Sequence, residues 1–371
     1  MRTVVVAFGT RPEAIKLAPV IRLLSDVDDI RVCVVNVGQH AEVLDETIAA
    51  FGITPDYRLD VMRRAQPLAT LTSRALQSIS EVLEKERPEM VIGQGDTTTV
   101  MASALAAFYY HIPFAHVEAG LRTGIRDLPF PEEMNRRLTG TLSTLHFAPT
   151  DAARDNLLRE GVDPSRIEVT GNTVIDALFW MLKNGPAPES AIDRYLHDPR
   201  RLIAVTAHRR ESWGAPLEEI AAAISEIARA DPDVFVVFPV HPNPTVRSTM
   251  NKILRGLDNV EMIEALPYQS FVHLMNGAYI LLTDSGGIQE EAAALHKPVL
   301  VMRDVTERSE GIAVGTAELV GRKASDIVCG VRNLLDDPAE YRARCERINP
   351  YGDGRAAERI VRRVTENLRT G

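Results

Sequence analysis

The sequence has few cysteines, no long apolar run and no block of a single charge. Its three cysteines, Cys33, Cys329 and Cys345, have a spacing that fits neither a disulfide framework nor a cysteine zinc site. This usage is typical of a reducing compartment, so we expect a cytoplasmic location. No uncharged stretch approaches the roughly 20 residues of a membrane-spanning helix. The N-terminal apolar run is also too short for a signal-peptide core, so no membrane partner is expected.

The charge balance argues against a nucleic-acid partner. The chain has 51 acidic and 42 basic residues, a formal net charge of -9, without long single-sign blocks. A nucleic-acid surface would concentrate Lys and Arg on one face. Because net charge averages over the whole surface, a local basic pocket for a phosphorylated small molecule remains compatible. No G-x-x-x-x-G-K-[ST] motif occurs, which argues against P-loop hydrolysis of ATP or GTP.

The apolar pattern predicts an α/β protein with parallel sheets. The 371 residues exceed one typical domain and fit two of roughly 150 to 200 residues each. Short runs rich in Val, Ile and Leu alternate with amphipathic stretches, which is typical of strands covered by helices on both faces. The runs are residues 3–8, 31–37, 89–94, 114–119, 145–150, 167–171, 202–207, 233–240, 279–284 and 298–303.

A predicted helix after Gly171, followed by a Gly-Pro linker at residues 185–188, marks the expected boundary between two domains. We predict an N-terminal domain over residues 1–172 and a C-terminal domain over residues 173–351. Residues 352–371 read as an amphipathic helix with no strand after it.

Polar residues gather where the predicted strands end. In open parallel sheets, ligands bind beyond the carboxyl ends of the strands. Two sheets with such polar ends suggest a ligand held between two facing domains. The segments concerned are "GTRPEAIK", "GQHAEVLDE", "GDTTTV" and "EAGLRTG" in the first half, and "HRRESW", "HPNP", "DSGGIQEE" and "RDVTERSE" in the second.

The segment "DSGGIQEEAAALHKP", residues 284–298, suggests a phosphate site. Ser285 ends a strand, Gly286 and Gly287 let a ligand approach the backbone, and a helix follows. The free N–H groups of a helix start favour an anion, and Glu291 is placed to accept hydrogen bonds from ribose hydroxyls. The alternative is that Ser285 is an ordinary helix N-cap. Both interpretations stay open on this segment alone.

Three other segments of the second half carry cations or imidazoles. His208, Arg209 and Arg210, in "AHRRES", can neutralise a pyrophosphate, although a solvated arginine pair is the alternative. His241, in "VHPNP", fits either a ligand contact or a rigid loop. Of Arg303 and Arg308, in "RDVTER", we expect one to face the ligand.

The candidate acids lie in the first half. Asp96 and Glu118 are single acids at the ends of apolar strands, which is typical of an acid/base site when cations lie opposite. Glu132 and Glu133 follow "LPFP" at a predicted helix start. Acids at that place also stabilise the helix dipole, so a structural role is the alternative for this pair.

Taken together, the motifs resemble the non-hydrolysing UDP-N-acetylglucosamine 2-epimerases. The resemblance runs from residue 8 to about residue 321 in consistent order, and the final helix fits too. The motifs are "FGTRPEAIKLAPV", "GQGDTTTV", "HVEAGLRTG", "PFPEEMNRRL", "GNTVIDAL", "AHRRES", "VHPNP", "TDSGGIQEEA" and "VLVMRDVTER".

The resemblance implies two Rossmann-like domains that face each other across a cleft in the GT-B arrangement. A UDP-sugar would occupy the cleft, and the C-terminal helix would cross back to the first domain. Members of this family interconvert UDP-GlcNAc and UDP-ManNAc, usually as homodimers. They use neither a metal nor a nicotinamide cofactor, so no cofactor is expected here.

The resemblance also implies roles for individual residues. The acid/base carboxylates would be Asp96, Glu118 and Glu132, and His208 would join Arg11, Lys16 and Arg308 as cations on the departing pyrophosphate. In the opening turn, Gly9 and Pro12 would shape the chain, and Glu13 would be a structural partner rather than a catalyst. The remaining substrate contacts would be Phe271, Ser285, Gly286, Gly287 and Glu291.

Many bacterial relatives bind a second UDP-GlcNAc as an activator. The residues of this chain that fit such a site are Gln39, His40, Arg209 and His241. Glu42 and Ala65 stand where the pattern has Gln and Arg, with Arg64 as a shifted substitute, so activation is left open.

The departures from the family pattern at Leu266, Glu42, Ala65 and Ser309 leave room for a related, modified UDP-HexNAc. Three further alternatives are a hydrolysing 2-epimerase, a GT-B glycosyltransferase and a UDP-sugar sensor without turnover.

Overall fold

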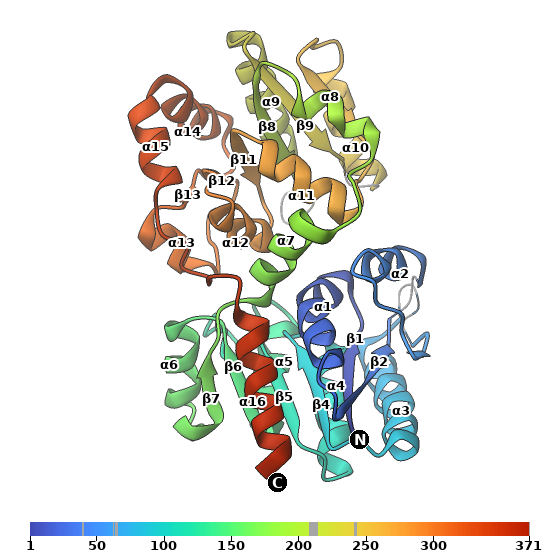
Figure 1. Cartoon of the computed structure of the whole chain (residues 1–371). Coiled ribbons are helices and arrows are strands. Elements are labelled where there is room, and N and C mark those ends of the chain that lie inside the picture. Colours follow the sequence, from blue (N-terminus) through green and yellow to red (C-terminus); the bar gives the residue numbers. More distant parts are fainter. Residues whose placement is uncertain (39–40, 62, 64–65, 208–213, 241–242, 371) are drawn as a thin grey trace. The chain divides into compact units, whose positions relative to one another are not determined.

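The structure is a computed structural model, and it describes residues 1–38, 41–61, 63, 66–207, 214–240 and 243–370. The chain divides into two compact units (Figure 1). The first comprises Met1–Lys183 with Gly352–Gly371, and the second comprises Asn184–Tyr351. In the described residues, no helix is both long enough and apolar enough to span a bilayer.

The first unit is built on a seven-stranded sheet in the order β3-β2-β1-β4-β5-β6-β7, and all its strand pairs are parallel. Its central strands are buried on both faces, as parallel strands covered by helices must be. The strands are β1 (Arg2–Phe8), β2 (Ile30–Asn36), β3 (Tyr57–Arg58), β4 (Met90–Gln94), β5 (Phe114–Val117), β6 (Leu145–Ala148) and β7 (Ile167–Val169).

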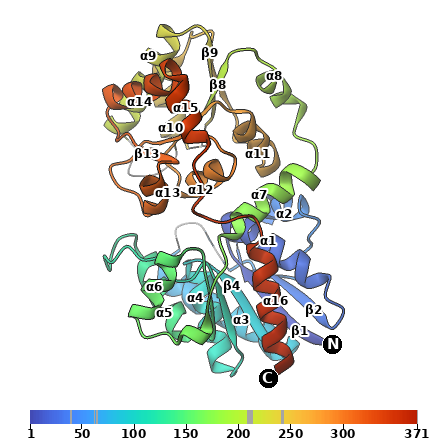
Figure 2. The ribbon, with the colours of Figure 1, turned by 60° about the vertical axis from the view of Figure 1, so that its left-hand side comes forward.

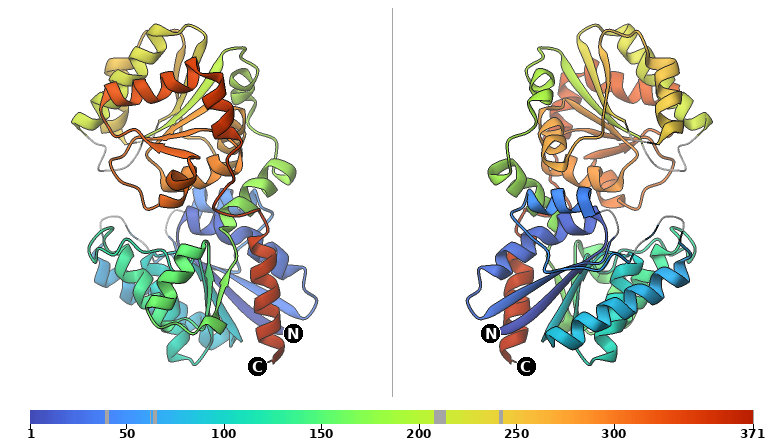
Figure 3. Two further views of the ribbon diagram at one scale, coloured as in Figure 1. Left: turned by 90° about the vertical axis from the view of Figure 1, so that its left-hand side faces the viewer. Right: turned by 90° about the vertical axis from the view of Figure 1, so that its right-hand side faces the viewer.

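Two rows of helices accompany this sheet. One row has α3, α4 and α5 in contact, and the other has α2, α1 and α16 (Figures 2 and 3). The C-terminal helix buries the apolar face that its sequence predicts, including Ile360, Val364 and Leu368. The helices are α1 (Arg11–Ser25), α2 (Ala41–Ala49), α3 (Leu68–Glu86), α4 (Thr98–Tyr109), α5 (Glu132–Leu142), α6 (Asp151–Arg159), α7 (Thr173–Asn184) and α16 (Ala356–Thr370).

The second unit repeats the topology with a six-stranded parallel sheet in the order β10-β9-β8-β11-β12-β13. When the strands of each unit are numbered from the first, both sheets have the order 3-2-1-4-5-6, and the first unit adds a seventh strand at the end. This is the strand order of Rossmann-like domains. Its strands are β8 (Arg201–Thr206), β9 (Val234–Pro239), β10 (Val260–Ile263), β11 (Ile280–Thr283), β12 (Val299–Val301) and β13 (Ala317–Leu319). Its helices are α8 (Asp193–Leu196), α9 (Ala215–Ala230), α10 (Pro244–Leu254), α11 (Tyr268–Gly277), α12 (Gly286–Ala294), α13 (Ser309–Val314), α14 (Ala324–Asp336) and α15 (Pro338–Cys345).

The predicted α/β class with two parallel sheets is confirmed, and each predicted run contains a strand. Three described strands were not predicted, namely β3, β10 and β13. All three lie at sheet edges. An edge strand has fewer neighbours to bury it, so it does not need the continuous apolar run on which the prediction relied.

The first unit extends to Lys183 rather than to the predicted boundary at Asn172. Helix α7 packs on this unit: the ring centroid of Trp180 on this helix lies 5.1 Å from the ring centroid of Phe51. The Asp176 carboxylate also accepts hydrogen bonds from the backbone N–H groups of Ala356 (3.2 Å) and Ala357 (2.8 Å) at the start of α16. The helix after Gly171 therefore belongs to the first unit, and the Gly-Pro linker follows the boundary.

Candidate active site

The polar strand ends of each unit lie beside the point where its strand order reverses, between β1 and β4 and between β8 and β11. Crevices at such points are the usual ligand sites of doubly wound sheets. In the first unit, Lys16 lies on the helix after β1, Asp96 follows β4 and Glu118 follows β5. In the second unit, Ser285 follows β11. The sequence prediction therefore placed its candidates at the edge where a ligand is expected.

The turn after β1 is held by a buried acid. The Glu13 carboxylate accepts hydrogen bonds from the Gly9 N–H (3.1 Å) and the Thr97 hydroxyl (2.7 Å). A Cβ at Gly9 would lie 2.4 Å from the Thr99 hydroxyl oxygen, so the turn requires glycine there. Burial raises the pKa of Glu13 to about 7. The contacts of Glu13 are therefore those of a structural residue. The predicted cation Arg11 is exposed at the start of α1.

Glu118 receives several donors at one carboxylate oxygen. Its Oε2 accepts hydrogen bonds from Lys16 Nζ, from Gln94 Nε2 (2.9 Å) and from Asn172 Nδ2 (3.3 Å). The side chains of Lys16 and Glu118 are only 10% and 8% exposed. The backbone of Glu118 has a φ of 63°, in the left-handed region that few non-glycine residues adopt. Such strain at a charged residue is characteristic of functional sites.

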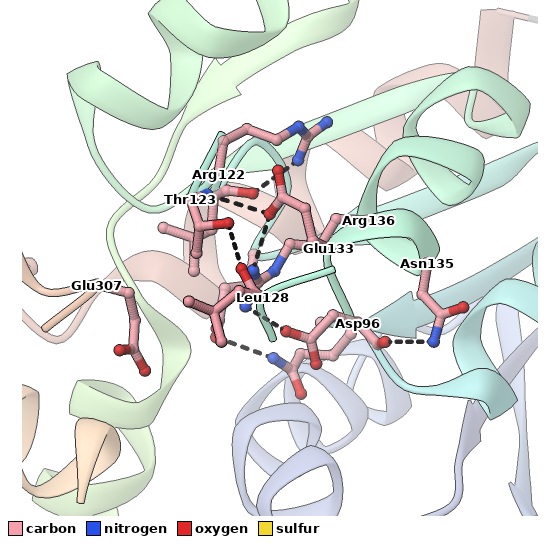
Figure 4. Close-up of polar contacts among 12 residues, drawn as sticks. Asp96, Arg122, Thr123, Leu128, Glu133, Asn135, Arg136 and Glu307 are labelled. Atoms are coloured by element: carbon pink, nitrogen blue, oxygen red, sulfur yellow. Dashed lines mark hydrogen bonds and ion pairs between the residues drawn. The ribbon is translucent and has the colours of Figure 1, made fainter. Parts of the chain in front are cut away.

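The loop that carries Asp96 is fixed at its backbone and at its side chain (Figure 4). Asn135 Nδ2 donates to the Asp96 carbonyl oxygen at 2.9 Å, and His116 Nε2 lies 2.7 Å from the Gly95 carbonyl oxygen. Burial lowers the pKa of His116 to about 3, so the ring is neutral and its Nε2–H donates. The Asp96 carboxylate pairs with Arg136, whose Nη2 lies 2.6 Å from Oδ2.

The two adjacent acids at the start of α5 have different surroundings. Glu132 Oε2 is buried and, in the described part of the chain, has no hydrogen-bond partner. Glu133 is fully buried and accepts hydrogen bonds from the N–H groups of Thr123 (3.1 Å) and Gly124 (3.3 Å). Desolvation alone would raise the pKa of Glu133, but these bonds and Arg136 together lower it. Glu132 therefore has spare acceptor capacity, whereas Glu133 is an anchored structural charge.

In the second unit, Ser285 occupies the N-cap position of α12 without a side-chain capping hydrogen bond. The ordinary-cap interpretation therefore lacks its defining contact. Nothing lies within 4 Å of a Cβ built at Gly287, so there is open space beside this residue in the first turn of the helix. Glu291 accepts a hydrogen bond from the Tyr268 hydroxyl at 2.9 Å, which fixes its carboxylate.

Both arginines after β12 are paired with acids. Arg308 Nε donates to Glu290 Oε1 at 2.6 Å, and Arg303 Nη1 donates to Glu307 Oε2 at 3.0 Å. Both arginines are buried. Phe271 on α11 is partly buried.

Several predicted residues lie outside the described residues. They are Gln39, His40, Arg64, Ala65, His208, Arg209, Arg210 and His241. Among the described residues, no cluster of three or more His, Cys, Asp or Glu side chains could hold a metal.

Sequence reasoning missed the residues that hold the acids in place. These are Gln94, His116, Asn135, Arg136 and Asn172. Each lies within or next to a motif that the sequence singled out, but amides and imidazoles at strand and helix ends also satisfy backbone groups there. A polar residue inside an otherwise apolar strand, such as Gln94 and His116, was the available signal.

Comparisons with known proteins agree on one family. A family model described as UDP-N-acetylglucosamine 2-epimerase matches residues 22–365. The chain is 51% identical over 367 residues to a UDP-N-acetylglucosamine 2-epimerase of Yersinia pestis, with 97% of each chain covered. It resembles the structure of the UDP-GlcNAc 2-epimerase of Neisseria meningitidis bound to UDP-GlcNAc, with a TM-score of 0.91, 43% identity and coverage of 98% of this chain and 100% of that one. The enzyme of Methanocaldococcus jannaschii in complex with UDP-GlcNAc and UDP gives a TM-score of 0.80, 34% identity and coverage of 99% and 100%.

Proposed function

The chain belongs to the UDP-N-acetylglucosamine 2-epimerase family, and from this premise we propose that it interconverts UDP-GlcNAc and UDP-ManNAc by elimination and re-addition of UDP. The intermediates would be UDP and 2-acetamidoglucal, both held by the enzyme. Relatives whose structures contain UDP-GlcNAc support a UDP-sugar as the substrate.

The order of bond breaking follows from the chemistry at C2. The C2 hydrogen of GlcNAc has no adjacent carbonyl, so a side-chain base cannot remove it directly. When the C1–O bond breaks first, its electron pair leaves with UDP and the ring becomes oxocarbenium-like. The C2 hydrogen then becomes acidic, a carboxylate takes the proton, and a C1=C2 double bond forms. Protonation of C2 on the opposite face and re-addition of UDP give the epimer.

The observation that carries this proposal is the set of acids at one edge of the first sheet. Asp96 and Glu118 follow the adjacent parallel strands β4 and β5, and each has an oriented cation, Arg136 or Lys16. Glu132 adds a buried oxygen with no partner among the described residues. An elimination followed by a re-addition needs carboxylates at C2 and cations on the departing diphosphate. This edge offers the carboxylates, and Lys16 offers a cation for the diphosphate.

The second unit offers a complementary set for the nucleotide. The uncapped start of α12, with Ser285, Gly286 and Gly287, supports a diphosphate contact because free N–H groups and the helix dipole favour an anion. We assign Glu291 to the ribose hydroxyls and Arg308 to the diphosphate. The role of His208, the homodimer and the cytoplasmic location stay predictions from the sequence.

Proton NMR in deuterated water tests the proposal. The protein is incubated with UDP-GlcNAc alone, without metal or nicotinamide. Appearance of UDP-ManNAc with deuterium at C2 is the expected result. Free ManNAc would point to a hydrolysing enzyme instead. An unchanged substrate would contradict the proposal and favour a sensor, a transferase without its acceptor or a modified UDP-HexNAc.

The variant Asp96→Asn tests the assignment of the acid. It should nearly abolish C2 exchange, because an amide cannot take the proton, while UDP binding measured by calorimetry remains detectable. Exchange at the wild-type rate would remove Asp96 from the chemistry.

A further inference from the structure

Helix α5 places one guanidinium between two carboxylates at the candidate active site. Arg136 Nη2 lies 2.6 Å from Asp96 Oδ2, and Arg136 Nη1 lies 3.2 Å from Glu133 Oε2 (Figure 4). The Arg136 side chain is 9% exposed, so water screens these contacts little. One side chain thus links Asp96, which is assigned to catalysis, with Glu133, the anchored structural charge.

The surroundings of Glu133 fix its carboxylate beside this guanidinium. Its side chain is fully buried, and two backbone N–H groups of the loop before α5 donate to it. Arg137 Nε lies 3.6 Å from the other carboxylate oxygen, Oε1. The surrounding donors lower the pKa of Glu133, so it stays ionised behind Arg136. A planar guanidinium held at one edge by a fixed carboxylate keeps its other edge in a defined orientation.

The backbone of the Asp96 loop is fixed by other residues. Asn135 holds the Asp96 carbonyl oxygen, and His116 holds the Gly95 carbonyl oxygen. Loss of Arg136 would therefore leave the loop in place and release the carboxylate alone. Among the described residues, Arg136 makes the ion pair that orients this carboxylate, and it does so through Oδ2. Within the described part of the chain, no hydrogen bond to the second oxygen, Oδ1, accompanies this pair.

We propose that Arg136, anchored by Glu133, is a positioning residue that fixes Oδ2 of Asp96 and leaves Oδ1 to exchange the proton at C2. This rests on the proposed function, in which Asp96 is one of the acids at C2. In the elimination direction the C2–H electrons form the C1=C2 bond, the C1–O electrons leave with UDP, and the proton moves to Oδ1. A carboxylate displaced by about 1 Å can lose roughly 100-fold in rate. Arg136 supplies that placement without contacting the sugar.

The test is a double-mutant cycle on C2 exchange. Steady-state epimerisation and deuterium incorporation at C2, followed by mass spectrometry, are measured for Arg136→Gln, Asp96→Asn and the double variant. Arg136→Gln should lower kcat about 100-fold and leave KM within about threefold. In the Asp96→Asn background the same substitution should have little further effect. Arg136→Lys keeps the charge but loses the planar group that contacts both carboxylates. Its kcat should be about tenfold higher than that of Arg136→Gln.

A matched control separates positioning from a general loss of stability. Arg344 in the second unit also bridges two carboxylates, with Nη2 2.6 Å from Glu318 and Nε 2.8 Å from Glu340, and its side chain is 13% exposed. Arg344→Gln should keep kcat even if its melting temperature falls as far as that of Arg136→Gln. Should Arg136→Gln not fold, Arg136→Lys enters the cycle in its place.

Two results would overturn the proposal. An Arg136 effect of equal size in both backgrounds, or an effect confined to KM, would give Arg136 a role that does not pass through Asp96. Wild-type exchange in Asp96→Asn would instead remove the catalytic assignment on which the proposal rests, so failure of the premise and failure of the inference can be told apart.

Discussion

Both units bury a cation–carboxylate pair at the ends of their parallel strands, but the surroundings of the two pairs differ. Lys16 and Glu118 in the first unit are 10% and 8% exposed at the side chain, and Arg308 and Glu290 in the second are 10% and 2% exposed. Glu118 sits on a strained backbone and receives two amide donors in addition to its cation. Glu290 lies within a regular helix, α12. The shared topology places an ion pair at the carboxyl ends of the strands in each unit. The side chains around each pair determine which function the pair can have.

The largest expected difference between the two pairs is in turnover. Glu118→Gln should lower kcat about 1,000-fold, because it removes an assigned acid/base group and a partner of Lys16. Glu290→Gln removes one carboxylate that orients Arg308, while Glu307 stays 3.7 Å from the same guanidinium, so it should raise the KM for UDP-GlcNAc and change kcat less than about tenfold. Steady-state kinetics on both variants measures the difference.

Stability provides the control for this comparison. Removing one partner of a buried ion pair costs up to about 3–5 kcal/mol, so both variants should unfold at lower urea concentrations to a similar extent. Equal losses in kcat for the two variants would mean that the pairs have the same role, and the distinction between them would be wrong.

The sequence predicted much of this comparison. Alternating apolar runs and amphipathic stretches predicted two parallel sheets, and the polar residues after β1, β4, β5 and β11 predicted which edge carries the candidates. The partner of each acid could not be predicted in the same way. Glu118 accepts from Gln94 and Asn172, which are 24 and 54 residues away in the chain. Such partners are fixed by strand order and loop geometry, which hydrophobic periodicity does not encode.

Glu133 illustrates the same limit. It adjoins Glu132, and both acids suit a helix start equally well by sequence. The structure separates them because Glu133 is fully buried under the loop before α5, whereas Glu132 keeps an unpartnered oxygen among the described residues. Which of two adjacent acids faces the loop depends on how the helix is rotated, and that is a property of packing.

A smaller effect is expected at Glu13, the buried acid that holds the turn after β1. Glu13 accepts hydrogen bonds from neutral donors, and burial raises its pKa to about 7 from the usual 4.5. The folded state therefore binds more protons than the unfolded state between these values, and the stability due to Glu13 is lost as the pH rises through about 7. Glu13→Gln resembles the protonated form, so it should be nearly neutral near pH 4.5 and stabilise the protein by about 2–3 kcal/mol at pH 8.

Urea denaturation of wild type and Glu13→Gln at both pH values measures this effect. Glu290→Gln serves as a comparison, because it removes a carboxylate that has a cation and should destabilise at pH 8. A gain for Glu13→Gln that is the same at both pH values would show that ionisation of Glu13 is not its cause.

The smallest effects separate the glycines of the two units. A Cβ at Gly287 meets nothing within 4 Å, whereas a Cβ at Gly9 would lie 2.4 Å from the Thr99 hydroxyl oxygen. Gly287→Ala should therefore leave the melting temperature unchanged or slightly raised, since alanine favours a helix by up to about 1 kcal/mol. Gly9→Ala should lower the stability by about 1–3 kcal/mol through overpacking.

If the start of α12 binds the diphosphate through its backbone, the methyl group of Gly287→Ala stands where the phosphate must approach, and UDP affinity should fall about tenfold, or 1.4 kcal/mol. Calorimetric titration with UDP measures that loss, and unchanged affinity would move the diphosphate away from α12.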